Sequence, residues 1–564
     1  MSGATSVREA TFGRPDATLG STGRRGAVPS VLVMDALRGR AVLGALALLL
    51  TQACGAAGVA GRAGDRPEVR LDSGWIRGIE DGDVVRFRGI RYAEPPVGEL
   101  RWRPPEPVAA WQGVVPAARS GPACPQASDN PKESSDAEDC LTLDVTVPKK
   151  KGERPRPVMV WLHGGGFNAG RGSDYDPRRL VAQGDVVVVT VEFRLGVLGY
   201  LALPGMSGGG AFGLQDQQAA LRWVRRNAAA FGGDAGNVTL FGESGGGIAT
   251  CGHLTSPGSR GLFHKAIIQS GTCGTVLLPN AAAPGTPRIP YWRPLNETYA
   301  ATRTAARQAG CRDAARTLEC LRAKPVKELL DLTAYFTAAS YGGPTLPADP
   351  GEALRDGNFA RVPVLSGHTS KEALMMAGVM SLLGRPITDA GLPRLLREGF
   401  GDRADEVARR YPRDRFGSAA EAWAAPYTDA IFSCPHVATQ DALAERTTVY
   451  AYVFGDDTAP PFVPALPGFP AGAGHASELA YLFDVKEKPI ALDGRPVPLT
   501  QTQRSVARDM VTAWTTFART GTPASGGKAW PRWQGGAPVA HLIGERPGGT
   551  ATTPAPRCDL FDRP

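Results

Sequence analysis

The sequence predicts an α/β fold in which a mostly parallel central sheet is covered by helices on both faces. Residues 156–167 (RPVMVWLHGGGF) and 184–195 (GDVVVVTVEFRL) each contain a continuous apolar run, which is typical of strands buried on both faces. Residues 212–231 (FGLQDQQAALRWVRRNAAAF) show the amphipathic pattern of a helix. Because strands and helices alternate along the chain, we expect parallel strands joined by helical crossovers.

Further elements are predicted on both sides of this central region. Residues 84–92 (VVRFRGIRY) alternate and then enter a proline-rich stretch, which predicts short strands and turns from about 70 to 147. Residues 237–244 (NVTLFGES) predict another strand, and a helix is expected directly after it. Two later strands are predicted at 361–369 (RVPVLSGHT) and 448–455 (TVYAYVFG).

The length allows one large domain or two or three smaller ones. Because no internal repeat and no long linker occurs, we expect one domain over residues 65–564, with helical insertions near 275–360 and 374–440. The 564 residues are 42% hydrophobic and 21% charged, which is typical of a globular protein with a sizeable core. The formal net charge is +8. No basic stripe interleaved with aromatic residues accompanies it, so a nucleic-acid partner is not expected.

Residues 1–60 are predicted to be an N-terminal extension and a signal peptide rather than part of the fold. Two arginines precede an apolar run from 41 to 50, which is too short to span a bilayer and is followed by small residues. Met34 is the expected start, and the protein is predicted to be secreted. The alternative is a lipoprotein anchored to a membrane through Cys54, although the bulky Gln52 makes a poor lipidation motif.

Eight cysteines remain besides Cys54, an even number that predicts disulfide bonds in a secreted protein. They are Cys124, Cys140, Cys251, Cys273, Cys311, Cys320, Cys434 and Cys558. No two have the C-x-x-C spacing, which argues against zinc, and no metal is expected. Short separations favour the pairs Cys124–Cys140 and Cys311–Cys320.

Ser244 is the candidate nucleophile. It lies in the pattern Gly242-x-Ser244-x-Gly246, at the predicted junction of a strand and a helix. A serine on such a sharp turn has a strained backbone, and the glycines let the neighbouring chain pass. A flexible glycine-serine loop is the alternative, because the pattern alone is common in a chain with 70 glycines.

A nucleophilic serine needs hydrogen-bond donors for the oxyanion that develops during attack. The sequence HGGGF at 163–167 follows a predicted strand about 80 residues before Ser244. Gly165 and Gly166 are candidate backbone donors, because glycines let amides converge without Cβ obstruction. Gly245, directly after the serine, is the third candidate donor.

His475 is the candidate base, among seven histidines. It lies in a glycine-rich loop after a predicted strand, downstream of the serine, whereas His436 and His541 lack such a loop. Glu372 is the candidate acid, because it follows the strand predicted at 361–369 and precedes His475. A solvated glutamate at a helix start is the alternative for Glu372.

Longer stretches accompany these motifs in a fixed order. They include FRGIRYAEPPVGELRWRPPEP (87–107), EDCLTLDV (138–145), FRLGVLGYL (193–201), LFHKAIIQSG (262–271) and WTTFARTGTP (514–523). Together they resemble the type-B carboxylesterases, a family that includes carboxylesterases, cholinesterases and bacterial p-nitrobenzyl-type esterases. The resemblance runs from about residue 65 to the end of the chain.

The resemblance implies an α/β-hydrolase fold with Ser244 as nucleophile, Glu372 as triad acid and His475 as base. It also implies that Gly165, Gly166 and Gly245 form the oxyanion hole. By analogy Ser270 lies beside the triad, although a serine capping a strand end is an equal alternative.

The resemblance supports the disulfides Cys124–Cys140 and Cys311–Cys320 and implies Cys434–Cys558. Cys251 and Cys273 do not match the usual cysteines of the family, so they either pair near the active site or stay free.

The sequence departs from the family at three places. Gly245 stands where alanine is usual, and Glu192 stands where asparagine is common. The loop 124–140 contains no aromatic residue. In cholinesterases the corresponding loop carries a tryptophan that binds quaternary ammonium groups, so choline esters are not expected to be substrates here.

We therefore expect a secreted serine carboxylesterase that hydrolyses small-molecule esters through an acyl-enzyme, without a metal or organic cofactor. Two alternatives remain open at this point. The same triad serves acyl transfer and the cleavage of amides or carbamates. The family also contains adhesion-type members without the nucleophile, which act only as binding domains.

Overall fold

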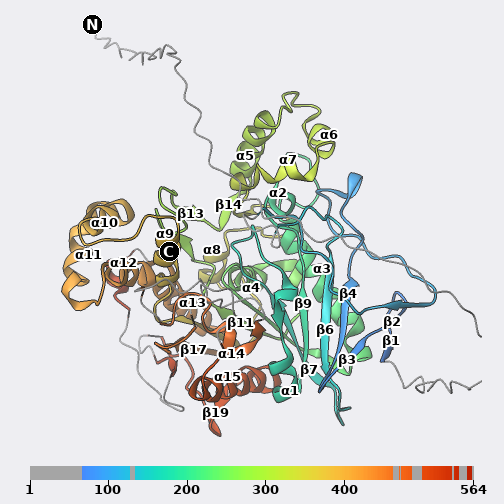
Figure 1. The fold of residues 1–564 in the computed structure, drawn as a ribbon. Helices are drawn as coiled ribbons and strands as arrows, with labels where there is room; N and C mark the ends of the chain where they lie inside the picture. Colours follow the sequence, from blue (N-terminus) through green and yellow to red (C-terminus); the bar gives the residue numbers. More distant parts are fainter. Residues whose placement is uncertain are drawn as a thin grey trace, which may run out of the picture. The chain divides into compact units, whose positions relative to one another are not determined.

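The computed structural model describes residues 67–127, 134–460, 469, 472–485, 498–535, 539–544 and 556–561. The predicted N-terminal extension and signal peptide, with Met34 and Cys54, lie outside these residues. A ten-stranded sheet occupies the centre of the described chain (Figure 1). Its strands, in order across the sheet, are β21 (His541–Ile543), β17 (Val449–Phe454), β16 (Val364–Thr369), β11 (Lys265–Gln269), β10 (Gly233–Glu243), β7 (Arg156–Leu162), β9 (Val187–Val191), β6 (Thr142–Pro148), β4 (Val84–Arg91) and β3 (Ile79–Asp81).

The predicted mostly parallel sheet is confirmed, with an antiparallel edge. All pairings from β21 to β9 are parallel, whereas β9–β6, β6–β4 and β4–β3 are antiparallel. The segments that follow β7, β10, β16 and β17 therefore leave the sheet at one common edge. In α/β proteins this carboxyl edge is where binding sites form.

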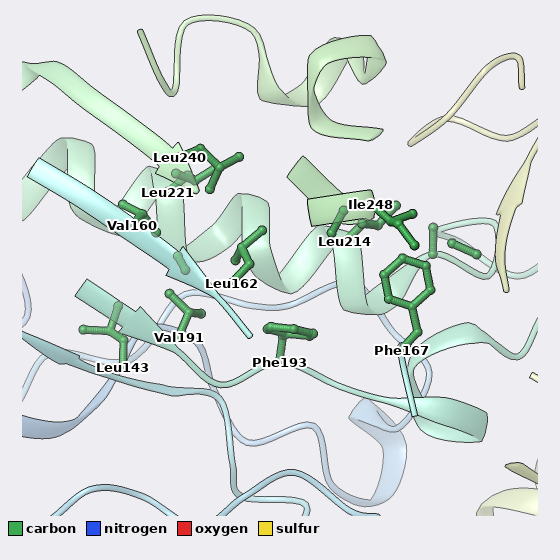
Figure 2. Close-up of a cluster of buried hydrophobic side chains, with 14 of the residues drawn as sticks. Leu143, Val160, Leu162, Phe167, Val191, Phe193, Leu214, Leu221, Leu240 and Ile248 are labelled. Atoms are coloured by element: carbon green, nitrogen blue, oxygen red, sulfur yellow. The ribbon is translucent and has the colours of Figure 1, made fainter. Parts of the chain in front are cut away.

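The continuous apolar runs follow from coverage on both faces of the sheet. Along β7, Val158, Val160 and Leu162 belong to one buried cluster, whereas Met159 and Trp161 belong to another. Successive side chains of a strand point to opposite faces, so both faces of β7 are packed. Figure 2 shows the first cluster, in which leucines and valines of the sheet meet Leu214 and Leu221 of a helix.

Helices cover the two faces as the sequence predicts. The first face is covered by α3 (Phe212–Asn227), α4 (Gly245–Thr255) and α13 (Cys434–Ala444), and the second by α1 (Arg178–Gly184) and α15 (Gln501–Thr520). The start of α15 is stabilised by a capping box between Thr500 and Gln503.

The two segments predicted as insertions contain further helices. They are α5 (Leu295–Gln308), α6 (Thr317–Arg322), α7 (Val326–Leu330) and α8 (Pro350–Arg355) in the first, and α9 (Leu374–Leu382), α10 (Leu392–Phe400), α11 (Ala404–Arg410) and α12 (Ala419–Thr428) in the second. Helices α9 to α12 bury their apolar residues in a cluster of their own. A π-helical turn, η8 (Asp429–Ser433), joins α12 to α13.

Four disulfides are present in the described chain. They are Cys124–Cys140, Cys251–Cys273, Cys311–Cys320 and Cys434–Cys558. Cys251 and Cys273, whose pairing the sequence left open, are bonded to each other. In the described ranges, we find no helix with the length and apolar character needed to cross a membrane.

Candidate active site

Ser244 occupies a sharp turn between a strand and a helix. Strand β10 ends at Glu243 and α4 begins at Gly245, so Ser244 is the single residue between them. Its backbone has φ 56° and ψ −121°, a strained conformation for a residue with a side chain. Two hydrogen bonds stabilise it: the Ser244 amide donates to Gln269 O at 2.9 Å, and Ser244 O accepts from Ile248 N at 2.9 Å.

Glycine is required on both sides of this turn. A Cβ at Gly246 would lie 2.0 Å from the carbonyl oxygen of Leu162, and one at Gly242 would lie 2.5 Å from the carbonyl carbon of Gly246. These contacts are shorter than any van der Waals contact, so a side chain would push the turn out of place. The pattern Gly-x-Ser-x-Gly therefore has a steric cause here.

The structure brings His475 and Glu372 to Ser244. His475 Nε2 lies 2.9 Å from Ser244 Oγ, and His475 Nδ1 lies 2.5 Å from Glu372 Oε2. The other carboxylate oxygen of Glu372 accepts from the Thr369 amide at 2.7 Å. The His475 amide also donates to Glu372 O at 3.2 Å. Glu372 is completely buried, so the alternative of a solvated glutamate does not apply.

The opposite charges of Glu372 and His475 counteract the effect of burial on the pKa of each group. Burial acts to raise the pKa of Glu372, but the His475 charge, their hydrogen bond and the nearby His368 hold it below its ordinary value. Burial acts to lower the pKa of His475, but the carboxylates of Glu243 and Glu372 outweigh burial and raise it to about 9. The two glutamates, one at each ring nitrogen, thus stabilise the imidazolium that forms when His475 takes up a proton.

Two further buried glutamates lie at the site, and no sequence motif predicted either of them. Glu243 Oε1 is 3.2 Å from His475 Nε2, and burial raises the pKa of Glu243 to about 7. Glu478 accepts from Gln269 Nε2 at 3.3 Å, and burial and the Glu243 charge raise its pKa. The signal was present in the sequence, because Glu243 precedes Ser244 and Glu478 follows His475 by three residues.

The glycine turn after β7 lies against the serine turn. Gly165, Gly166 and Phe167 all have positive φ, at 101°, 62° and 67°. A Cβ on Gly245 would lie only 2.9 Å from Gly166 N, so the two turns are in contact. The amides of Gly165, Gly166 and Gly245 donate no hydrogen bond to another residue in the described ranges. They are therefore available as donors to a ligand.

A small cavity opens beside Ser244 and His475. Its volume is about 140 Å³. It is lined mainly by apolar side chains, namely Ile248, Leu277, Ala281, Ala282, Tyr291, Met375, Met376, Val379 and Phe432, together with Ser270 and Thr275. Ser270 thus lies beside the candidate triad and has a positive φ of 50°.

Three other histidines lie away from Ser244. His436 Nδ1 pairs with Ser366 Oγ at 2.9 Å, and His541 stacks on Trp530 with ring centroids 4.0 Å apart. His253 is buried between Ser259 and Gln217. None of these three contacts Ser244. No group of three or more metal-ligating side chains occurs among the residues that the structure describes.

Glu192, one of the three departures from the family pattern, is a buried carboxyl next to the end of β9. Its Oε1 accepts from the Ser173 amide at 3.2 Å, and its Oε2 has no partner within the described ranges. Burial, with smaller contributions from Asp144 and Asp174, raises the pKa of Glu192 to about 8. The folded protein therefore holds Glu192 protonated at neutral pH.

We expect Glu192 to make the fold less stable as pH rises. Its pKa is about 8 in the folded chain and about 4.5 when unfolded, so between these values the folded state binds more protons. Its contribution to stability is present below pH 4.5 and is lost as pH approaches 8. The difference in free energy of unfolding between Glu192→Gln and the wild type should therefore shift by a few kcal/mol in favour of the variant as pH rises from 5 to 9.

Denaturant unfolding of both proteins at several pH values measures this difference. Glu421→Gln, in the first turn of α12, is the matched control for removing one carboxyl group. A constant difference between Glu192→Gln and wild type at all pH values would contradict the titration of Glu192.

The disulfide Cys251–Cys273 joins the helix of the serine turn to the wall of the cavity. Cys251 is on α4, and Cys273 follows β11 just before Thr275 and Leu277, which line the cavity. The carbonyl of Cys273 also accepts from Trp292 Nε1 at 2.9 Å. Both cysteines are buried.

Removing this disulfide should impair substrate binding as well as stability. Cys251→Ala/Cys273→Ala is expected to lower the free energy of unfolding by about 3 kcal/mol and to raise KM about fivefold, because the cavity wall loses its connection to α4. Cys311→Ala/Cys320→Ala, the matched control, should lower stability and leave KM unchanged. Equal KM values in the two variants would contradict a role in shaping the cavity.

Comparisons with a family model, with known sequences and with solved structures all identify esterases as similar to this chain. The carboxylesterase family model matches residues 65–553. The para-nitrobenzyl esterase of Bacillus subtilis (strain 168) is 34% identical over 483 residues, which cover 82% of this chain and 92% of that protein. The fumonisin B1 esterase of Sphingopyxis macrogoltabida is 34% identical over 504 residues, which cover 84% of this chain and 86% of that protein. A solved PNB esterase structure matches with a TM-score of 0.68 at 31% identity, covering 85% of this chain and 96% of that chain.

Proposed function

The chain belongs to the carboxylesterase family, and we propose that it hydrolyses carboxylic esters through an acyl-enzyme formed on Ser244. Its α/β-hydrolase fold and its family make it a carboxylic ester hydrolase that acts on small-molecule esters. The observation that carries the mechanism is the continuous chain of contacts from Ser244 Oγ through His475 to Glu372.

In the first half of the reaction, Ser244 Oγ attacks the ester carbonyl while His475 Nε2 takes its proton. Glu372 holds the imidazole in the required orientation and stabilises the imidazolium that forms. The carbonyl oxygen becomes an oxyanion, and the amides of Gly165, Gly166 and Gly245 are the donors that we assign to it. His475 then gives the proton to the departing alcohol, which leaves an acyl group on Ser244.

In the second half, water attacks the acyl group and His475 accepts its proton. The acid is released when His475 returns that proton to Ser244 Oγ. Neither half requires a metal or an organic cofactor. Acyl transfer to an alcohol, or amide or carbamate cleavage, would use the same residues, and product analysis with an added alcohol distinguishes transfer from hydrolysis. The assembled contacts of Ser244, His475 and Glu372 support catalysis over a role as a binding domain alone.

We also propose that the protein is secreted, and that residues 65–564 form one catalytic domain with its two insertions. Four disulfides in the described chain support an oxidising compartment. The predicted signal peptide and the alternative lipid anchor on Cys54 lie outside the described residues.

The cavity predicts a preference for short acyl groups. A cavity of about 150 Å³ accommodates one benzene molecule, so the 140 Å³ beside Ser244 suits an acyl chain of about four carbons. We expect kcat/KM for p-nitrophenyl butyrate to exceed that for p-nitrophenyl octanoate by at least tenfold. Met376→Ala, which enlarges the cavity, should narrow this ratio. A higher value for octanoate in the wild type would contradict this size limit, whereas no activity on acetate, butyrate or octanoate would contradict a general esterase.

A further inference from the structure

A second, larger cavity lies on the first face of the sheet, near the edge strand β21. Its volume is about 470 Å³, within the range of small-molecule binding pockets. Residues of β17, β21 and α13 line it, and so do residues of α11 and α12. It shares no lining residue with the cavity beside Ser244.

The π-helical turn η8 separates the two cavities. Phe432 of this turn lines the cavity beside Ser244, whereas Asp429 and Ser433 line the second cavity. The two cavities are thus neighbours with a wall one turn thick, and each is bounded by its own set of side chains.

The floor of the second cavity is apolar. It is formed by Val437, Ala451, Val453, Trp533 and Leu542. These residues belong to the buried cluster on the first face of the sheet or pack against that cluster. A hydrocarbon body placed on this floor would leave water and gain about 25 cal/mol per Å² of buried surface.

The charged groups of the second cavity favour an anion. Arg410, Arg415 and Arg557 line it, and the Arg557 guanidinium lies 4.8 Å from the ring centroid of Tyr411. Among the acids, Asp429 accepts from the Tyr411 hydroxyl, and burial raises its pKa and so disfavours its charge. Asp559, outside the lining, pairs with Arg410. The backbone amide of Arg557 hydrogen-bonds the Asp429 carboxyl, but neither the Arg415 nor the Arg557 guanidinium forms an ion pair among the described residues.

Two histidines also line the second cavity. His436 is 1% exposed, and its Nδ1 pairs with Ser366 Oγ at 2.9 Å. Its Nε2 has no partner in the described part of the chain. Burial and the neighbouring His368 lower its pKa, so the ring is neutral. His368, whose ring centroid lies 5.4 Å from that of His436, also lines the cavity.

We propose that this second cavity binds a free monocarboxylate with an apolar body, with the carboxylate at Arg415 and Arg557 and the hydrocarbon on the apolar floor. Carboxylates pair with guanidinium groups in a bidentate geometry, which an ester or an amide does not reproduce. Such a ligand has the chemistry of the acid that a carboxylic ester hydrolase releases. The binding proposal does not depend on the roles assigned to Ser244, His475 and Glu372.

The test is calorimetric titration of octanoate into protein whose first cavity is closed. Ser244 is first modified with a small alkyl phosphonate, and the modification is checked by mass spectrometry. If Ser244 does not react, the proposed function fails at that step, and Met376→Trp closes the first cavity instead. The binding experiment can therefore be carried out in either case.

We expect one octanoate to bind the closed protein, and octanamide to bind at least tenfold more weakly. Arg415→Gln and Ala451→Leu should each weaken octanoate binding at least tenfold, the first by removing a charge and the second by filling the floor. Arg303→Gln, an exposed arginine of α5, is the control and should bind octanoate like the wild type. Loss of binding on closing the first cavity, equal binding of octanamide, or wild-type binding by both Arg415→Gln and Ala451→Leu would overturn the proposal.

Discussion

Replacing Ser244 by alanine is expected to lower kcat for p-nitrophenyl butyrate by about 10⁶-fold. Alanine lacks the Oγ atom of Ser244, which is the candidate nucleophile and lies 2.9 Å from His475 Nε2. Without this atom no acyl-enzyme can form. The fold should be unaffected, because Ser244 is held by its backbone through Gln269 and Ile248 rather than by its hydroxyl. Initial rates and a thermal melt of the purified variant measure the two effects.

Two further variants test whether the loss of activity is specific to the candidate triad. Glu372→Gln should lower kcat by about 10⁴-fold, because the amide cannot hold His475 in the same orientation or balance its charge. Ser505→Ala, on α15 and outside the lining of the cavity beside Ser244, should retain wild-type kcat. Activity of Ser244→Ala above a tenth of the wild-type value would exclude Ser244 as the nucleophile.

Gly165→Ala is expected to lower kcat by about 10²- to 10³-fold, the effect of losing an oxyanion donor. A Cβ at this position would lie 2.1 Å from the carbonyl oxygen of Ala169, and φ is 101°. The glycine turn must therefore open, which moves the candidate donor amides away from Ser244. KM should change much less than kcat, because the donors act on the oxyanion and not on the bound ester.

Gly166→Ala is the matched control for this effect. Its φ is also positive, at 62°, but the nearest atom to its Cβ would be the Tyr291 hydroxyl oxygen at 3.5 Å. Only the left-handed conformation opposes alanine here, at about 1–2 kcal/mol. We expect a loss of tenfold or less, measured by the same initial rates. If Gly165→Ala is as active as Gly166→Ala, the assignment of the glycine turn to the oxyanion is wrong.

Much of the fold could be predicted because the relevant signals are local. The apolar runs of β7 and β9 reflect burial on both faces, and the amphipathic pattern of α3 reflects burial on one. The antiparallel edge formed by β6, β4 and β3 was not predicted. Strand direction depends on which strand is the neighbour, and no pattern within a strand encodes its neighbour.

The candidate site was predicted from motifs and chain order, and its electrostatics were not. Glu372 and His475 are 103 residues apart in sequence, and the resemblance to a family with this order was needed to pair them. Glu243 and Glu478 were missed because a glutamate in a sequence is expected at the surface. Their raised pKa values arise from burial around His475, which only the packed structure produces.

By itself the sequence determined the periodicity of the strands and helices, the glycines of the two turns, and the three residues that are candidates for the triad. Each depends on interactions within a few residues, or on an ordered set of long motifs. The tertiary structure decided the pairing of Cys251 with Cys273, the size of the cavity beside Ser244, and the cluster of charges around His475. These depend on distances between segments that are remote in the chain, and such distances are set by the packing of the whole domain rather than by any local pattern.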